Sequence, residues 1–158
     1  MNKVFIRRAT FEELPIIQNL NLQLFQHDQV YDPLLNMNYS FSKNGKKYFQ
    51  DKISNKDSIC LVAEINNQII GYLAGGITKS YSYRTVKKQS ELENTLVLKE
   101  YRGKGIGNLL FCEFVKWSKK QGVEIINVKT STDNIKAIEF YKKEGFVSYS
   151  SELEYQVK

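Results

Sequence analysis

The segment from Glu100 to Gly107 reads Glu-Tyr-Arg-Gly-Lys-Gly-Ile-Gly, and it constrains most strongly what this chain can fold into. It follows an apolar, strand-like run from Leu96 to Leu98 and precedes apolar residues at helical spacing. Glycines allow a tight turn and let a ligand approach the backbone closely. Because the first amide hydrogens of a helix lack partners and Arg102 and Lys104 are cationic, this strand–loop–helix unit predicts a phosphate-binding site.

Two common glycine-rich loops do not fit this segment. A dinucleotide fingerprint requires the spacing G-x-G-x-x-G, whereas Gly103, Gly105 and Gly107 give G-x-G-x-G. The acidic ribose partner that should follow about 20 residues later is also missing. A nucleotide-triphosphate loop needs Ser or Thr after Gly-Lys, and here Asn108 follows Gly107. A helix start that needs glycine only for its turn remains open at this point.

A second motif, residues 134–146, reads Asn-Ile-Lys-Ala-Ile-Glu-Phe-Tyr-Lys-Lys-Glu-Gly-Phe. Asp133 or Asn134 suits the N-cap of a helix, and Gly145 suits the position just after its end. Tyr141 lies seven residues after Asn134, which is about two turns along the same helix face. Taken alone, Tyr141 would be a core aromatic residue.

Together, Arg102-x-x-Gly105-x-Gly107 and the segment 134–146 resemble the two cofactor-contacting motifs of the GNAT N-acetyltransferase superfamily. The resemblance extends over nearly the whole chain and implies acetyl-CoA as cosubstrate. It implies that loop amides hold the pyrophosphate, that a strand pairs with the pantetheine arm, and that the Tyr141 hydroxyl faces the sulfur as the catalytic acid. The cofactor-binding residues expected on this basis are Leu96, Val97, Leu98, Arg102, Gly103, Lys104, Gly105, Ile106, Gly107, Asn108 and Asn134.

Glu91 and Glu93 are the candidates for the catalytic base that accepts the proton of the amine. By resemblance, Glu91 matches the catalytic glutamate of the histone acetyltransferases, and Glu93 matches that of the spermidine/spermine acetyltransferases. Strand alternation puts both side chains on one face unless a bulge intervenes. A solvent-facing carboxylate and a relay of bound water are the alternatives. Lys129 stands where ribosomal-protein N-terminal acetyltransferases carry a glutamate, which argues against that activity.

The pattern of elements predicts one domain over residues 1–158. We expect an α/β (α+β) fold of the GNAT type, with a single mixed, mostly antiparallel central sheet and helices on both faces. Thr10 and Glu13 form a capping box for the first helix, and Asn66-Asn67 suits a two-residue hairpin turn. Residues 27–43 are expected to be irregular. The expected strands are 3–8, 58–65, 68–78, 87–98, 123–130 and 146–157, and the expected helices are 10–25, 45–53, 106–122 and 134–144.

Composition excludes several classes of protein. The net charge is +6, but the lysines are scattered and no nucleic-acid-binding module fits, so no nucleic-acid partner is expected. Cys60 and Cys112 do not suggest a disulfide framework, and His27, the single histidine, argues against a metal site. No apolar run is long enough to span a bilayer, so no membrane partner and a cytoplasmic location are expected.

The sequence therefore predicts direct acetyl transfer from acetyl-CoA to a primary amine. The acceptor is a small molecule or the lysine or N-terminal amine of a peptide. A polyamine or aminoglycoside acetyltransferase is the alternative within the enzyme class. An acyl-CoA-binding sensor that has lost activity is the alternative outside it. Pairing into a homodimer is left open.

Overall fold

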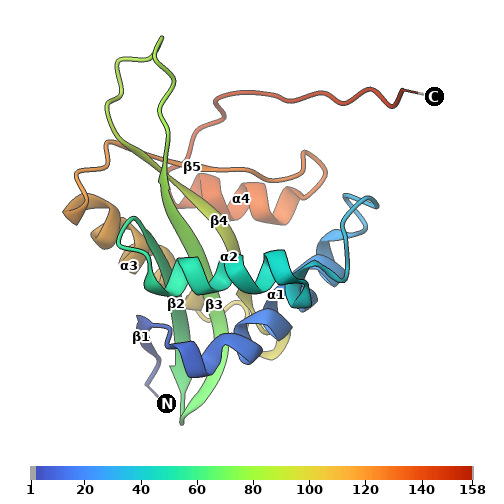
Figure 1. Ribbon diagram of the computed structural model, residues 1–158, viewed down its shortest axis with the longest axis vertical. Coiled ribbons are helices and arrows are strands. Elements are labelled where there is room, and N and C mark those ends of the chain that lie inside the picture. The colour runs from blue at the N-terminus through green and yellow to red at the C-terminus, as the bar shows by residue number, and fades with distance from the viewer. Residues whose placement is uncertain (1–2, 158) are drawn as a thin grey trace.

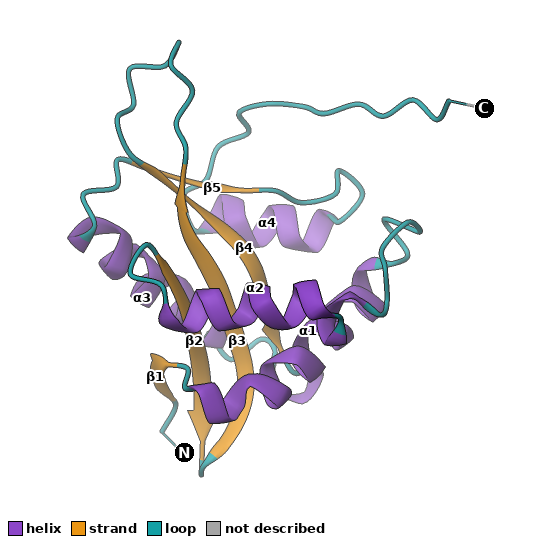
Figure 2. Ribbon diagram, viewed as in Figure 1, coloured by secondary structure: helices purple, strands orange, loops and turns teal. Residues whose placement is uncertain are grey.

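A computed structural model describes residues 3–157, which form one five-stranded sheet in the order β1-β2-β3-β4-β5 (Figure 1). The first four strands are antiparallel, and β5 runs parallel to β4. Helices α1 and α2 cover one face, and α3 and α4 cover the other (Figure 2). This confirms the expected α/β fold with a mixed, mostly antiparallel sheet. The strands are β1 Phe5–Arg8, β2 Ser58–Ile65, β3 Gln68–Thr78, β4 Gln89–Val97 and β5 Ile125–Val128, and the helices are α1 Leu14–Asp28, α2 Lys43–Ser54, α3 Ile106–Lys120 and α4 Ile135–Lys143.

Local signals in the sequence account for several element boundaries. Asn66 and Asn67 turn the β2–β3 hairpin with φ values of 49° and 62°, in the left-handed region that asparagine tolerates. The capping box of Thr10 and Glu13 opens a short 3₁₀ turn that leads directly into α1. Helix α2 begins two residues earlier than expected, because the Ser42 hydroxyl caps it by accepting from an amide of its first turn.

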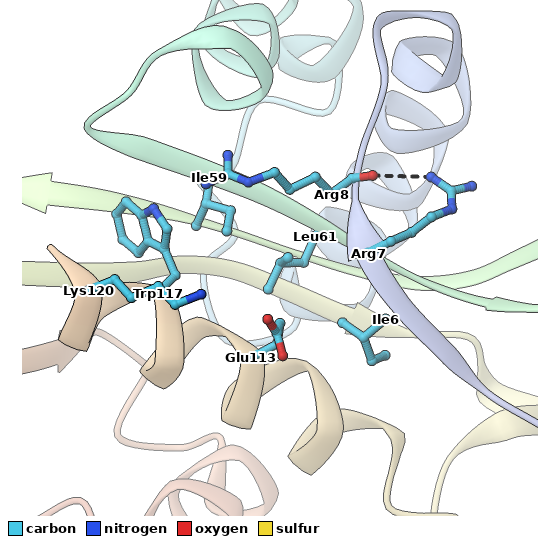
Figure 3. A pocket seen from close by; sticks show the side chains of 8 residues that line it. All are labelled: Ile6, Arg7, Arg8, Ile59, Leu61, Glu113, Trp117 and Lys120. Atoms are coloured by element: carbon cyan, nitrogen blue, oxygen red, sulfur yellow. Dashed lines mark hydrogen bonds between the residues drawn. The ribbon is translucent and has the colours of Figure 1, made fainter.

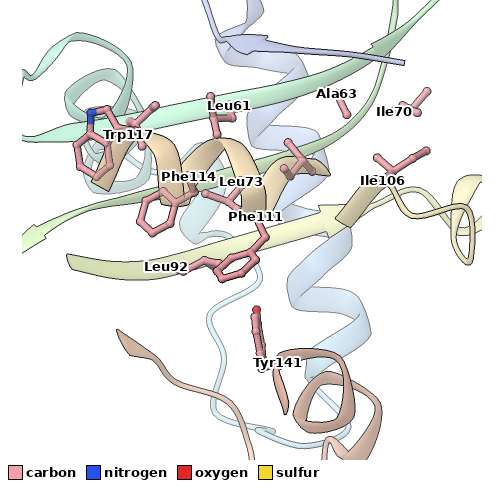
Figure 4. Close-up of a cluster of buried hydrophobic side chains, with 12 residues drawn as sticks. Leu61, Ala63, Ile70, Leu73, Leu92, Ile106, Phe111, Phe114, Trp117 and Tyr141 are labelled. Carbon is pink, nitrogen blue, oxygen red and sulfur yellow. The ribbon is translucent and has the colours of Figure 1, made fainter. Parts of the chain in front are cut away.

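The sheet separates two cores. On the face covered by α3 and α4, a cluster centred on Phe114, which is fully buried, includes Leu92, Trp117 and Tyr141 (Figure 4). On the opposite face, Phe49 of α2 and the side chains of α1 pack against the other sides of β2, β3 and β4. No helix among residues 3–157 combines the length and the apolar character needed to cross a membrane.

A β-bulge in β4 changes which side chains face each core. Ala74 of β3 pairs with Asn94, but the next residue, Gly75, pairs with Leu92, so Glu93 is an extra residue in β4. Leu92 packs in the core beneath α3, whereas Leu96, four residues later, packs in the core beneath α1 and α2. Regular alternation would put both leucines on one face, so the bulge reverses the pattern partway along the strand.

The prediction of a final strand at 146–157 is wrong for the described chain. Helix α4 ends before Gly145, whose φ is 97°, and Phe146 packs against Phe111 and Tyr141. Residues 147–157 then form no strand and leave the body of the molecule (Figure 1). The segment alternates apolar and polar residues as a strand does, but it pairs with no strand among residues 3–157. Alternation indicates which side of a segment is apolar, but it does not indicate which strand, if any, the segment pairs with.

Candidate active site

The glycine-rich loop joins the end of β4 to the start of α3. Gly103 and Gly105 have φ values of 73° and 78°, which an L side chain rarely adopts. A Cβ atom built on either glycine would meet no atom within 4 Å, so both face open space. Gly107 differs, because its Cβ would lie 3.3 Å from the Phe140 ring of α4. The first two glycines leave the loop backbone open to a ligand, and the third lets α3 and α4 pack closely.

The loop presents a run of unpaired backbone donors. The first backbone hydrogen bond of α3 joins the Leu109 amide to the Gly105 carbonyl at 3.1 Å. Within the described chain, the N–H groups from Gly103 to Asn108 donate no hydrogen bond to backbone or side chain. Unpaired amides at a helix N-terminus favour an anion, and the helix dipole adds to the attraction. The geometry therefore suits a phosphate group at this loop.

The cationic side chains of the loop are exposed and fold back onto the backbone. Arg102 Nε donates to the Val97 carbonyl at 2.8 Å, and Lys104 Nζ donates to the Glu100 carbonyl at 3.1 Å. These contacts keep both positive charges close to the backbone of the loop and of the preceding residues. At the start of α3, Asn108 Nδ2 donates to the Glu144 carboxylate at 2.7 Å, which ties α3 to the end of α4.

Strand β4 has an open edge next to this loop. Its pairing with β5 runs from Gln89 to Leu92, whose partner Val128 is the last residue of β5. Residues 94–97 of β4 therefore pair only with β3 in the described chain, and Glu93 is the extra residue of the bulge. An extended ligand can add to such an edge as a further strand would. This edge includes Leu96 and Val97, and Leu98 follows directly.

Tyr141 lies on α4, on the face of the sheet that α3 and α4 cover. The side chain is 9% exposed, and its hydroxyl points from α4 toward β4 (Figure 4). The hydroxyl makes no hydrogen bond among residues 3–157, yet it is not one of their fully enclosed unpartnered atoms. Burial raises the pKa of this phenol above its usual value near 10, so Tyr141 is a neutral donor at pH 7. Its position agrees both with a core aromatic residue and with the predicted acid.

Asn134 is buried and caps α4. Its Oδ1 accepts from the Ala137 amide at 3.2 Å, so the amide nitrogen of the side chain stays available to a ligand. The capping function that the sequence predicts is therefore present in the structure. It does not conflict with the predicted contact to the cofactor arm.

The two candidate bases have different surroundings. The bulge points Glu93 toward α2, where the Tyr48 hydroxyl donates to Oε2 at 2.6 Å and Lys52 forms an ion pair with Oε1. Both carboxylate oxygens of Glu93 are thus engaged. Glu91 forms no ion pair and no side-chain hydrogen bond among the described residues, and it pairs through its backbone with Asn127 of β5. The structure therefore brings Glu93, and not Glu91, into a polar cluster.

This cluster contains residues that sequence reasoning did not select. Asn94, turned to the same side as Glu93 by the bulge, donates to the Tyr48 hydroxyl at 2.7 Å. Asn21 of α1 lies 3.4 Å from the Asn94 amide oxygen. Tyr48 and Lys52 are four residues apart, so the sequence could have predicted that they are neighbours on one face of α2. No local signal indicates that this face meets β4, because that contact depends on how the helix packs.

A separate pocket of about 150 Å³ lies between β1, β2 and α3 (Figure 3). Its lining includes Arg8, Glu113, Trp117 and Lys120, and none of the predicted site residues. The described residues contain no cluster of three or more His, Cys, Asp or Glu side chains arranged to hold a metal ion. The chemistry-bearing residues therefore gather at the opposite end of α3 and along β4.

The model of the acetyltransferase (GNAT) family matches residues 22–146, which is most of the chain. The chain belongs to the GNAT family. An uncharacterized N-acetyltransferase of Methanocaldococcus jannaschii is 26% identical over 142 residues, covering 89% of this chain but 59% of that protein. The streptothricin acetyltransferase of Escherichia coli is 30% identical over 107 residues, covering 68% of this chain and 58% of its own length. The chain thus spans less than two thirds of the length of both relatives.

Solved structures show the same fold. A protein from Bacillus halodurans superimposes with a TM-score of 0.79 at 21% identity, covering 97% of this chain and 99% of that one. The aminoglycoside N-acetyltransferase AAC(6')-Iy in complex with CoA superimposes with a TM-score of 0.78 at 16% identity, covering 100% of this chain and 97% of that one. At these identities the likeness concerns the fold alone.

Proposed function

We propose that this GNAT protein transfers an acetyl group from acetyl-CoA to a primary amine by direct attack of the amine on the thioester. One observation carries the proposal: the unpaired amides from Gly103 to Asn108 follow directly after the open edge of β4, and the Tyr141 hydroxyl points toward β4. Residues 1–158 would form one catalytic domain. In it, the amides from Gly103 to Asn108 would hold the pyrophosphate of the cofactor. The pantetheine arm would pair along Leu96 to Leu98, next to the Asn134 side chain.

The reaction has three requirements that these residues meet. Positioning the thioester beside the amine lowers the barrier by several kcal/mol. A backbone N–H of β4 would stabilise the negative charge that develops on the carbonyl oxygen. Burial raises the pKa of Tyr141, so its phenol is neutral at pH 7 and would donate a hydrogen bond to the departing CoA thiolate, which makes it the candidate acid. We propose that Glu93 accepts the proton of the amine through water, with Glu91 as the alternative base.

The acceptor that we favour is a small-molecule amine. The streptothricin acetyltransferase is a curated relative, and aminoglycoside acetyltransferases are among the structural neighbours. An N-alpha-acetyltransferase of Sulfurisphaera tokodaii is 28% identical over 104 residues. The N-terminal amine of a protein is therefore the second candidate acceptor. Lys129 supplies no carboxylate at the position that the N-terminal acetyltransferases of ribosomal proteins use.

A thiol-release assay over a panel of amines, combined with calorimetric titration of CoA, tests the function. We expect CoA binding and turnover on at least one class among aminoglycosides, polyamines and peptide N-termini. Binding of CoA without turnover on any amine would instead favour the sensor function.

A pair of matched variants tests the base. Glu93→Gln should lower kcat/KM for the preferred amine by about tenfold or more, whereas Glu91→Gln should change it little. The opposite pattern would assign the base to Glu91, and an unchanged kcat/KM in both variants would leave the proton transfer to water alone.

A further inference from the structure

The pocket between β1, β2 and α3 combines apolar walls with cationic side chains. Ile59 and Leu61 of β2, which are 2% and 1% exposed, belong to its apolar lining. Arg8 of β1 and Lys120 of α3 are exposed and line the same space (Figure 3). The volume is about 150 Å³, and an apolar cavity of that size can hold one benzene ring. The size and the lining therefore suit a small ring that carries a polar substituent.

Trp117 of α3 contributes a buried hydrogen-bond donor to this pocket. The side chain is 5% exposed, and its Nε1 atom is enclosed without a hydrogen-bond partner among residues 3–157. In Figure 3, this nitrogen lies on the side of the indole ring that faces the Arg8 side chain. An indole N–H can only donate, and buried donors in native proteins are nearly always paired. The unpaired N–H therefore indicates that an acceptor is missing here.

The two cations cannot supply that acceptor. Within the described chain, Arg8 and Lys120 form no ion pair, and neither side chain donates a hydrogen bond. A guanidinium, an ammonium and an indole N–H have donors alone, so none of the three can pair with another. They can share an acceptor that lies between them. A carboxylate suits this arrangement, because it has two acceptor oxygens and a negative charge.

The other charged residues of the described lining are already paired. Glu113 of α3 forms an ion pair with Lys116 at 3.0 Å. The Arg7 guanidinium is bound by the carboxylates of Glu13 and Glu64. Arg8 and Lys120 therefore give the pocket a net positive charge that no side chain of residues 3–157 balances.

The pocket lies near the end of α3, where helix carbonyls disfavour an anion. A helix end carries roughly half an elementary negative charge, against two full positive charges on the cations of the pocket. The carbonyls of residues 117–119 also accept hydrogen bonds from the amides of residues 121–123. The balance of charge therefore still favours an anion.

We propose that this pocket binds a small aromatic carboxylate. The ring would pack against Ile59 and Leu61, and the carboxylate would accept hydrogen bonds from the Trp117 N–H and from Arg8. Lys120 would add an ion pair at the rim. Because Arg8 is exposed, its side chain can move to admit the ligand. This site is independent of the proposed acetyl transfer, since none of its residues belongs to the acetyl-CoA site.

Titration with benzoate tests the site directly. Trp117 is the single tryptophan of the chain, so its indole N–H gives one cross-peak in a proton–nitrogen correlation spectrum. We expect this cross-peak to move with a Kd on the order of 1 mM, as is typical of so small a ligand. At equal ionic strength, benzyl alcohol, which lacks the carboxylate, and acetate, which lacks the ring, should move it less. Saturation with CoA should leave the response to benzoate unchanged.

Matched variants test the cations. Arg8→Gln and Lys120→Gln should each raise the Kd of benzoate by about threefold or more, whereas Lys119→Gln should change it little. Lys119 is the neighbouring exposed cation of α3 and does not line the pocket. Trp117→Phe removes the N–H while keeping an aromatic side chain, so benzoate should raise the melting temperature of this variant less than that of the unchanged protein.

Four results would each overturn the proposal. They are an indole cross-peak that benzoate does not move, an equal response to benzyl alcohol or to acetate, equal benzoate affinity in Arg8→Gln and Lys119→Gln, and loss of the response when CoA is bound. The last result would place benzoate at the CoA loop instead.

Discussion

Replacing Gly105 by alanine, with Gly122→Ala as its control, separates the cost of backbone strain from the loss of the proposed phosphate contact. Gly105 has a φ of 78°, and in the left-handed region a side chain costs roughly 1–2 kcal/mol. For a chain of this size that cost corresponds to a fall in melting temperature of roughly 2–4 °C per kcal/mol. Gly122, at the end of α3, has a φ of 73° and equally open surroundings, so Gly122→Ala carries the same strain far from the loop.

The two variants should therefore melt alike but bind CoA differently. The new methyl group of Gly105→Ala would enter the space that we assign to the pyrophosphate and displace it from at least one amide. A hydrogen bond to a charged group contributes about 1.5–3 kcal/mol, which corresponds to a roughly 10- to 100-fold rise in the Kd of CoA. Calorimetric titration measures this difference. Equal CoA affinity in both variants would refute the assignment of the loop.

Three further perturbations probe the site and the core. Tyr141→Phe should lower kcat by about 100-fold or more while changing the Kd of CoA less than threefold, as expected for loss of a general acid, and an equal loss in both quantities would assign Tyr141 to packing. The free energy of unfolding should fall as pH rises from about 9 toward 12, because burial raises the pKa of the Cys60 thiol to about 12 and the unfolded thiol ionises first; a urea midpoint that stays constant over this range would contradict this. Phe114→Ala should destabilise the fold by about 3–5 kcal/mol because Phe114 is fully buried, whereas Phe11→Ala, at a side chain 51% exposed, should cost far less in the same urea titration; equal losses would contradict the assigned core.

The parts of the fold that the sequence predicted are those set by neighbouring residues. The Asn66-Asn67 turn, the Thr10 capping box and the loop before α3 each depend on a few adjacent side chains and their backbone preferences. The two motifs that carry the family resemblance are of the same local kind. These features therefore fixed the order of the elements and the position of the candidate site along the chain.

The parts that the sequence missed depend on partners distant in the chain. The bulge at Glu93 is defined by the pairing of β4 with β3, so the sequence of β4 alone does not predict it. The ion pair of Glu93 with Lys52 likewise depends on how α2 crosses the sheet. The segment 147–157 shows the same limit, since it alternates as a strand does but pairs with no strand among residues 3–157.

A crystal structure with bound acetyl-CoA tests the central claim most directly. We predict that the diphosphate oxygens lie within hydrogen-bonding distance of the amides from Gly103 to Asn108, with the thioester sulfur facing the Tyr141 hydroxyl across the open edge of β4. A cofactor bound elsewhere, with these amides still unpaired, would contradict the account.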